Sequence, residues 1–395
     1  MSKVFVLALL AILGVGATVW YVQRTPVEAP APAVSETSPL PSPAKTQAPP
    51  ITDVGFNTFS YRYATEVAHI DGVRNTVFSP FTTYVQLLFL ERASNHRLGK
   101  VDGEDTRHTA RTLDSLFRDP ALKYSSDFTV SRGIGIDEWT SREFARNKIA
   151  YTVDPASLAA VPSQLDGVDP KNLGATIRGI WTSRFALDCT WEAENAVSVI
   201  EAPFQTLAGN TVQRDFVVFE CQARYCCIPQ GEVLVVEIPY KEGYSLLAVM
   251  PGNWDPALAI STLRAVTSGE RKLKEKTWSE VSFPRFTCDK ADNIDDLLTS
   301  LGFFSLYTDG IPLVGTATKG LRCEATIMTK ARIICDEHGT RMEAETVAEI
   351  DIGDSGERPQ PLVLDHPFLY ALRHDATGII VGMGWVVDPT CEPIE

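Results

Sequence analysis

The sequence predicts an α+β fold in which antiparallel strand pairs are mixed with helices. Residues 233–253, VLVVEIPYKEGYSLLAVMPGN, read as two strands around a turn at Lys241 to Gly243. Residues 368–387, FLYALRHDATGIIVGMGWVV, read as a hairpin that turns at Asp375 to Gly378. Short turns of this kind join antiparallel neighbours, whereas parallel strands of a doubly wound sheet need a long crossover between them.

A buried helix is predicted after Ser79, within the stretch NTVFSPFTTYVQLLFLERAS at residues 75–94. Ser79 is a good N-cap, and Pro80 follows at the position where helix starts favour proline. Apolar side chains then recur at helical spacing from Phe81 to Leu90. Because the apolar stripe is wide, we expect this helix to lie deep in the domain.

The remaining segments alternate between strands and shorter helices. Strand patterns occur in WSEVSFPRFTC (278–288), in ATIMTKARIICDEHG (325–339) and in GATIRGIWTSRF (174–185), where a turn is expected to follow. A surface helix is predicted in HTARTLDSLFRD (108–119), and another helix in DNIDDLLTSLGF, capped by Asp292 or Asn293. This mixture supports the α+β class.

The first 24 residues have a different character from the rest. Lys3 precedes the uncharged apolar stretch 4–22, which is just long enough to cross a bilayer as a helix. It reads as a signal-anchor that stays attached, or as a signal peptide cut after Val15 and Ala17. Either reading places the domain outside the cytosol, as a membrane-anchored protein or a secreted one.

Residues 25–50 form a tether rather than a core. They are dense in proline, alanine and serine, a composition that stays extended and cannot pack. One globular domain is therefore predicted over residues 51–395. We expect it to be a monomer.

Charge and cysteine pattern exclude several classes of partner. The net charge is −14, so nucleic acid is not an expected partner. None of the eight cysteines forms a C-x-x-C pair and histidine is scarce nearby, so no metal and no other cofactor are expected. The even count permits disulfides in a translocated chain, although scattered free thiols are equally compatible with it.

The sequence contains no convincing catalytic residues. GDSG at residues 353–356 is similar to the nucleophile segment of trypsin-like proteases, but no histidine stands in a matching context. The adjacent pair Cys226 and Cys227 is a weak redox candidate, and a structural role is the simpler interpretation. We therefore expect that the protein is not an enzyme.

Six segments, in the right order, resemble the serpin family of protease inhibitors. They are NTVFSPFTTY, GIWTSRF, VEIPYKEGYSLLAVMP, VSFPRFTCDKADNIDDLLTSLGFFSLYTD, DEHGT and the closing DHPFLYALRHDATGIIVGMGWVVDPT. The resemblance implies a serpin fold, with a large central mixed β-sheet, further sheets and surrounding helices. The chain looks short between Thr152 and Trp181, so some helices are expected to be truncated.

The resemblance also assigns roles to residues. It places Ser79, Pro80 and Thr82 in the shutter under the main sheet and Trp181 in the breach at its end. The hinge is assigned to Glu337, Gly339, Thr340, Met342 and Ala344. Residues 336–361 then become the reactive-centre loop. In the family, a serine or cysteine protease cleaves this loop, which inserts as a new strand and traps the protease.

The loop sequence can be tested for insertion by its alternation. If Thr340 faces inward, the set of small or apolar side chains faces inward with it, while mostly charged ones face outward. The inward set is Thr340, Met342, Ala344, Thr346, Ala348 and Ile350, and the outward set is Arg341, Glu343, Glu345, Val347, Glu349 and Asp351.

Some residues depart from the pattern of inhibitory serpins. The run of small residues that such serpins favour is interrupted here by Arg341, Met342, Glu343 and Glu345. Thr329 stands where the family has a shutter histidine, and Leu173 or Asn172 where it has an asparagine. Two interpretations therefore remain: a suicide-substrate inhibitor, or a non-inhibitory serpin-fold binding or decoy protein.

The resemblance implies a reactive bond near Gly353, at the family's usual spacing from Gly339. Asp354 followed by Ser355 fits best, and Asp351 is the alternative. Both would suit an Asp-specific protease, meaning a caspase or granzyme B. The compact poxvirus serpins are similar in this respect. Arg358 would suit a trypsin-like protease, but Pro359 follows it and opposes cleavage.

Overall fold

The computed structural model describes most of the chain from residue 55 onward and one short segment before it. The longer described ranges are 16–21, 55–93, 116–130, 149–153, 179–228, 233–274, 277–308, 327–342 and 360–389. The shorter ones are 113, 138, 141–142, 145, 311–312 and 322–323.

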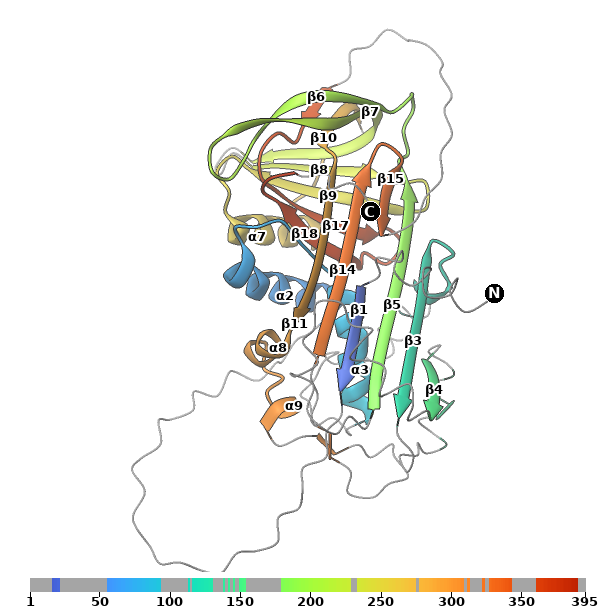
Figure 1. The fold of residues 1–395 in the computed structure, drawn as a ribbon. Coiled ribbons are helices and arrows are strands. Elements are labelled where there is room, and N and C mark those ends of the chain that lie inside the picture. The colour runs from blue at the N-terminus through green and yellow to red at the C-terminus, as the bar shows by residue number, and fades with distance from the viewer. Residues whose placement is uncertain are drawn as a thin grey trace, which may run out of the picture.

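The strands that run upright in Figure 1 form one mixed sheet, called the central sheet from here on. Across it the order is β11, β14, then β15 and β1 in a single slot, then β5, β3 and β4. All pairs are antiparallel except β3 with β4. The bounds are β1 Gly16–Tyr21, β3 Leu122–Val130, β4 Ile149–Val153, β5 Gly179–Thr190, β11 Phe286–Asn293, β14 Ile327–Asp336 and β15 Gly339–Met342.

The second sheet lies behind the upper half of the central sheet in Figure 1, with its strands crossing the upright ones. Its order is β16, β10, β7, β8, β9, β17, β18 and β2, and β6 also pairs with β7. The bounds are β2 Thr76–Phe78, β6 Ser198–Gln205, β7 Thr211–Ile228, β8 Val233–Pro239, β9 Tyr244–Pro251, β10 Thr277–Pro284, β16 Gln360–Val363, β17 Phe368–His374 and β18 Ile380–Val386. A separate two-stranded sheet joins β12 Ile311–Pro312 to β13 Arg322–Cys323.

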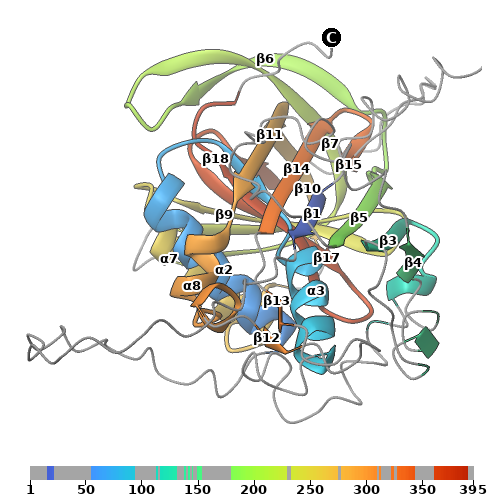
Figure 2. The same ribbon diagram turned by 60° about the horizontal axis from the view of Figure 1, so that its bottom comes forward.

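The helices gather on the lower half of the molecule, as the turned view in Figure 2 shows. They are α2 Phe56–Asp71, α3 Pro80–Ala93, α7 Pro256–Thr267, α8 Asp295–Ser300 and α9 Ser305–Thr308. The predicted buried helix is α3, where the Ser79 hydroxyl accepts a hydrogen bond from the Thr82 amide at 3.3 Å. Helix α3 contacts β1 and β5 of the central sheet, so it lies beneath the slot between β14 and β5.

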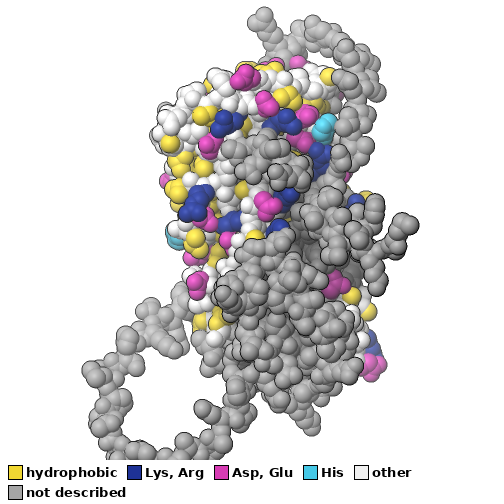
Figure 3. Space-filling model, in the orientation of Figure 1, with side chains coloured by type: hydrophobic (Ala, Val, Ile, Leu, Met, Phe, Trp, Pro, Cys, Tyr) yellow, Lys and Arg dark blue, Asp and Glu magenta, His cyan; other side chains and the backbone are white. Residues whose placement is uncertain are grey.

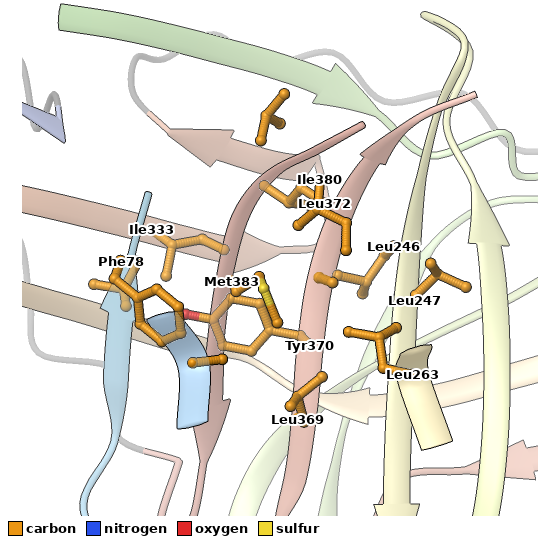
Figure 4. Close-up of a cluster of buried hydrophobic side chains, with 14 of the residues drawn as sticks. Phe78, Leu246, Leu247, Leu263, Ile333, Leu369, Tyr370, Leu372, Ile380 and Met383 are labelled. Carbon is orange, nitrogen blue, oxygen red and sulfur yellow. The ribbon is translucent and has the colours of Figure 1, made fainter. Parts of the chain in front are cut away.

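The core forms where the two sheets meet. Figure 4 shows Tyr370 and Met383 from neighbouring strands facing Phe78 and Ile333, which come from β2 and β14. The Tyr370 hydroxyl donates to the Thr76 carbonyl at 3.0 Å, which satisfies its polar end inside the core. Because these side chains are fully or almost fully buried, the second sheet is a fixed support for the central one.

Both predicted strand pairs are confirmed, as β8 with β9 and β17 with β18. The single strand predicted over residues 278–288 is wrong in one respect: it divides at Arg285 into β10 and β11, which belong to different sheets. The turn expected after residues 174–185 is also absent, because β5 runs on to Thr190. Helix α2 is an element that the sequence reading did not find.

The apolar segment 4–22 contributes β1 to the central sheet through residues 16–21. Its other residues lie outside the described part of the chain. Within the described part, none of the helices has the length and apolar character that crossing a membrane requires. The signal-anchor and signal-peptide readings remain predictions.

Candidate functional site

The candidate site is the hinge, where β14 ends, turns and returns as β15. The turn is Glu337 and His338, and the His338 amide donates to a carboxylate oxygen of Asp336 at 2.9 Å. Gly339 begins β15 with φ +147°, in the region that favours glycine. A Cβ there would lie 1.9 Å from the Cys189 carbonyl oxygen of β5. The hinge glycine is therefore required by both conformation and space.

Thr340 is the first residue of the hinge to face the core. Its exposed fraction is 1%, and its register partners are Cys335 on β14 and Cys189 on β5. The Thr340 hydroxyl accepts a hydrogen bond from the Tyr240 hydroxyl and lies 3.4 Å from the Cys335 sulfur. The predicted inward position of Thr340 is thus what the structure has.

A tryptophan supports the hinge from below, but it is Trp191 and not Trp181. The Trp191 indole nitrogen donates to the Asp336 carbonyl at 2.8 Å, and its ring stacks on Tyr240 at 4.5 Å between centroids. The backbone of Trp181 instead pairs with Phe128, near the opposite end of β5. The prediction of Trp181 as the breach residue is therefore wrong. That prediction rested on the resemblance of Trp181, four residues before Phe185, to the family's pattern. Following the strand to its end at Thr190 would have reached Trp191.

Charged side chains of both signs surround the hinge turn. Arg285 pairs with Glu337 at 3.1 Å, and Arg341 pairs with Asp336 at 2.5 Å. Figure 3 shows such charges gathered near the upper end of this face, over the ends of β14 and β15. Burial raises the pKa of Asp188 even though Arg341, its register partner, acts to lower it. Through its ion pair with Arg285, the predicted hinge residue Glu337 joins the turn to the junction between β10 and β11.

The shutter residues lie at the start of α3, beneath the central sheet. The Ser79 hydroxyl donates to the Val381 carbonyl at 2.9 Å, and the Thr82 hydroxyl donates to the Ser79 carbonyl at 3.2 Å. Pro80 is the first residue of α3. These contacts join the helix start to β18, and the shutter role of Ser79, Pro80 and Thr82 remains a prediction.

A polar cluster that the sequence reading missed lies around Ser183 on β5. The Gln86 side chain donates to the Ser183 hydroxyl at 3.0 Å, and the Ser126 and Tyr124 hydroxyls lie 3.0 and 3.3 Å from it. Gln86 was detectable as a polar residue within the apolar stripe of α3. Nothing local in β5 marked Ser183, because its partners come from separate segments. Thr329, read as the shutter position of β14, pairs through its backbone with Asp292.

Several predicted site residues lie outside the described part of the chain. They are Ala344, Asp351, Gly353, Asp354 and Ser355, together with Leu173 and Asn172. For Met342 only the backbone is described, and it pairs with Leu187 of β5.

Cysteine and acidic side chains show no metal or disulfide site where the structure describes them. No cluster of three or more His, Cys, Asp or Glu residues suited to a metal occurs in the described ranges. Within the same ranges Cys189, Cys226, Cys227 and Cys288 are free thiols. Burial is the first cause that raises the pKa of Cys288 to about 12, with Asp289 adding to it, so this thiol stays protonated.

Comparison with known proteins identifies the family. The chain is 25% identical over 242 residues to Serpin-ZXA of Oryza sativa subsp. japonica, which is 58% of this chain and 58% of that protein. It is 25% identical over 211 residues to serine proteinase inhibitor 2 of Myxoma virus, which is 53% of this chain and 60% of that protein. The alignments thus span somewhat more than half the length of these relatives.

The fold comparison agrees. The crystal structure of Serpin48 from the insect Tenebrio molitor matches with a TM-score of 0.67 and 19% identity, covering 85% of this chain and 97% of that one. The predicted α+β serpin fold is confirmed. The family model described as "Serpin (serine protease inhibitor)" matches residues 178–389. Because that match covers more than half of the chain, the protein belongs to the serpin family.

Proposed function

We propose that this serpin is a suicide-substrate inhibitor of a protease, with residues 343–359 as the segment that the protease binds and cleaves. One observation carries the proposal: the hinge strand β15 is already paired on both sides, with β14 and with β5. The chain that follows Met342 therefore starts inside the central sheet. A cleaved loop that continues this strand needs no new entry point.

The energetics favour insertion once the loop is cut. Each added main-chain hydrogen bond contributes about 0.5–1.5 kcal/mol net. The continuation from Met342 alternates small inward residues such as Ala344 and Thr346 with outward ones such as Glu345, as a half-buried strand requires. Thr340 is buried and hydrogen-bonded, so the residues that alternate with it on the same side of the strand would face the core.

The proposed target is an Asp-specific protease, with Asp354 before the cleaved bond and Ser355 after it. The support is the spacing from Gly339 and the D-x-x-D pattern that ends at Asp354; Asp351 is the alternative. A relative named serine proteinase inhibitor 2 from Myxoma virus is compatible with protease inhibition as the class of activity. On this proposal the chain acts as a monomer, is not an enzyme and needs no cofactor.

The test is a protease panel on the full chain. Granzyme B, several caspases and trypsin are incubated with it, and a covalent complex is sought on a denaturing gel. The proposal expects a complex with an Asp-specific protease and a cut after Asp354 by mass spectrometry. Asp354→Ala should abolish both, whereas Asp351→Ala removes only the first aspartate of the D-x-x-D pattern and should slow complex formation without moving the cut. A cut after Asp351 would transfer the site to that residue, and no cut by any Asp-specific protease would exclude this target class.

A non-inhibitory binding role is the second candidate. The observation that favours it is that residues 16–21 already fill the slot between β14 and β5, below the hinge. A sheet that is already filled releases little free energy when the loop is cut. Cleavage of the loop with no covalent complex for any protease would favour this reading.

The location and boundaries of the domain are also proposed. We propose that the globular domain spans residues 51–395, behind the proline-rich tether 25–50, and lies outside the cytosol. Residues 4–22 would anchor it in a membrane or would be cleaved. A fusion that adds a glycosylation acceptor to the C-terminus, expressed in eukaryotic cells, would become glycosylated only if the domain is translocated.

A further inference from the structure

The six residues of β1 lie in the slot that a cleaved loop would need. Both views place β1 between β14 and β5, directly below β15 (Figure 1, Figure 2). The strand is antiparallel to both neighbours, as β15 is. It therefore runs in the direction that the chain after Met342 would take.

The register can be followed from β15 into β1 on both sides. Met342 pairs with Leu187, so a continuing loop would place Ala344 opposite Phe185 and Thr346 opposite Ser183. In the structure Gly16 pairs with Phe185 and Thr18 pairs with Ser183. On the other side Arg341 pairs with Ile334, which would place Thr346 opposite Thr329, and Thr18 occupies that position.

The two segments are also similar in sequence at matched positions. Residues 16–21 are GATVWY, and the loop residues that would take the same six positions are AETVAE, residues 344–349. Thr18 and Val19 thus coincide with Thr346 and Val347, and the first position is small in both. Trp20 and Tyr21 differ from their counterparts in size.

The slot presents the same requirements to either occupant. Its neighbours β14 and β5 offer backbone groups for pairing on both sides, and helix α3 closes it from below. Ser183, at the level of Thr18, belongs to the buried polar cluster with Gln86 and Ser126. At the position opposite Ser183, a threonine suits the polar cluster better than an apolar residue would.

We propose that residues 16–21 are a built-in substitute for the inserted loop strand, and that they compete with the reactive loop for the slot. The consequence for inhibition rests on the proposed function, whereas the docking does not. Any process that withdraws the segment, such as cleavage before the tether or burial in a membrane, would reopen the slot. The tether of residues 25–50 is long enough for residues 16–21 to leave the slot, because an extended chain reaches about 3.3 Å per residue.

Disulfide trapping in the full chain tests the docking. Val19→Cys is combined with Thr182→Cys, its register partner on β5, and oxidised with glutathione disulfide. Register partners in an antiparallel pair lie within the Cα separation that a disulfide needs. The control combines Val19→Cys with Ala186→Cys, four residues along β5 and about 13 Å away. Peptide mapping separates these bonds from any at the native thiols. A disulfide joining positions 19 and 182 is expected at a yield several-fold above the control; equal yields would overturn the docking.

A proline variant tests the competition. Val19→Pro removes a donor from the middle of a central strand and should expel β1, whereas Val34→Pro in the proline-rich tether is the matched control. With the protease that cuts the loop, the fraction trapped as covalent complex should rise about threefold or more in Val19→Pro alone. After loop cleavage its melting temperature should also rise by about 10 °C more than that of the control.

The outcomes separate the two proposals. Equal trapped fractions and equal melting shifts in the unchanged chain and both proline variants would overturn the competition. If no chain traps a protease and none gains heat stability on cleavage, the proposed inhibitory function fails. The cross-link still decides where residues 16–21 lie in that case, because it does not depend on any protease.

Discussion

The Tyr240 hydroxyl donates a hydrogen bond to the Thr340 hydroxyl across 100 residues of sequence. Tyr240 follows β8 of the second sheet, and Thr340 is the inward residue of the hinge. Burial raises the pKa of Tyr240 well above its ordinary value, so the phenol remains a donor throughout the usable pH range. The contact therefore ties the hinge strand to the rigid support behind it, and the arrangement around it can be tested by substitution.

Replacing Tyr240 by Phe should lower the free energy of unfolding by about 1 kcal/mol, because one buried hydrogen bond is lost. It should also speed amide hydrogen exchange in residues 339–342 more than elsewhere, since Thr340 loses its partner in the second sheet. Urea denaturation and exchange mass spectrometry measure the two effects. Tyr225→Phe, which removes only a contact to exposed Lys274, is the control and should leave the hinge unchanged. Equal exchange in both variants would contradict the role of Tyr240.

Replacing Gly339 by Ala should destabilise the protein by about 2–4 kcal/mol or displace the hinge from the sheet. The added methyl would lie 1.9 Å from a backbone oxygen that cannot move away without breaking β5. Gly209→Ala is the matched control, because Gly209 also has positive φ but nothing within 4 Å of its Cβ. The control should cost only about 1 kcal/mol of conformational strain. Similar urea midpoints for the two variants would argue against close packing at the hinge.

On the proposed inhibitory function, replacing Thr340 by Arg should convert the protein into a substrate. A guanidinium at a position exposed by only 1% would leave a buried charge unpaired, at a cost of roughly 3–5 kcal/mol. The hinge should leave the sheet instead, so the protease cuts the loop without being trapped. Gel analysis of the reaction measures this.

Thr340→Val separates this effect from a general loss of folding. It keeps the shape of the side chain and loses the hydroxyl, so it should fold and still trap the protease. Covalent complex formation by Thr340→Arg at the level of the unchanged chain would rule out hinge insertion as the mechanism.

Thiol reactivity should divide by burial. Exposed Cys227 should react with iodoacetamide at pH 8, whereas Cys288, buried and with a pKa raised to about 12, should react only after unfolding. The raised pKa also predicts a pH effect on stability. Between about pH 9 and 12 the unfolded Cys288 loses its proton while the folded one keeps it, so stability should fall as pH rises. Cys288→Ala should flatten this part of the profile in urea titrations; an unchanged profile would contradict the assignment.

Local pattern was enough for the elements whose signals are short-range. The turns between β8 and β9 and between β17 and β18 carry glycine at positive φ, at Gly243 and Gly378, and the sequence located both. The start of α3 was located by Ser79 and Pro80 for the same reason. The inward position of Thr340 came from the resemblance of the hinge, and strand alternation then sorted the residues after it into two faces.

The sequence misplaced those elements whose position depends on pairing with segments far away in the chain. Residues 278–288 read as one strand, yet Arg285 marks the point where the chain leaves one sheet for the other, with its amide donating to the Asp215 carbonyl. Trp181 and Trp191 both stand in strand-like sequence. Only the pairing of β5 with β15 shows that Trp191 lies under the hinge.

The sequence by itself determined the fold class and the family resemblance, and through that resemblance it predicted the hinge glycine and threonine and the candidate reactive bond. Each of these depends on residue types at short spacing. Tertiary structure alone decided which tryptophan supports the hinge, that Gln86 and Ser183 form a polar cluster, and that residues 16–21 pair with both β14 and β5. The physical reason is that a strand has no partner within itself. Its neighbours are chosen by hydrogen bonding and packing between segments far apart in the chain, and no local pattern records that choice.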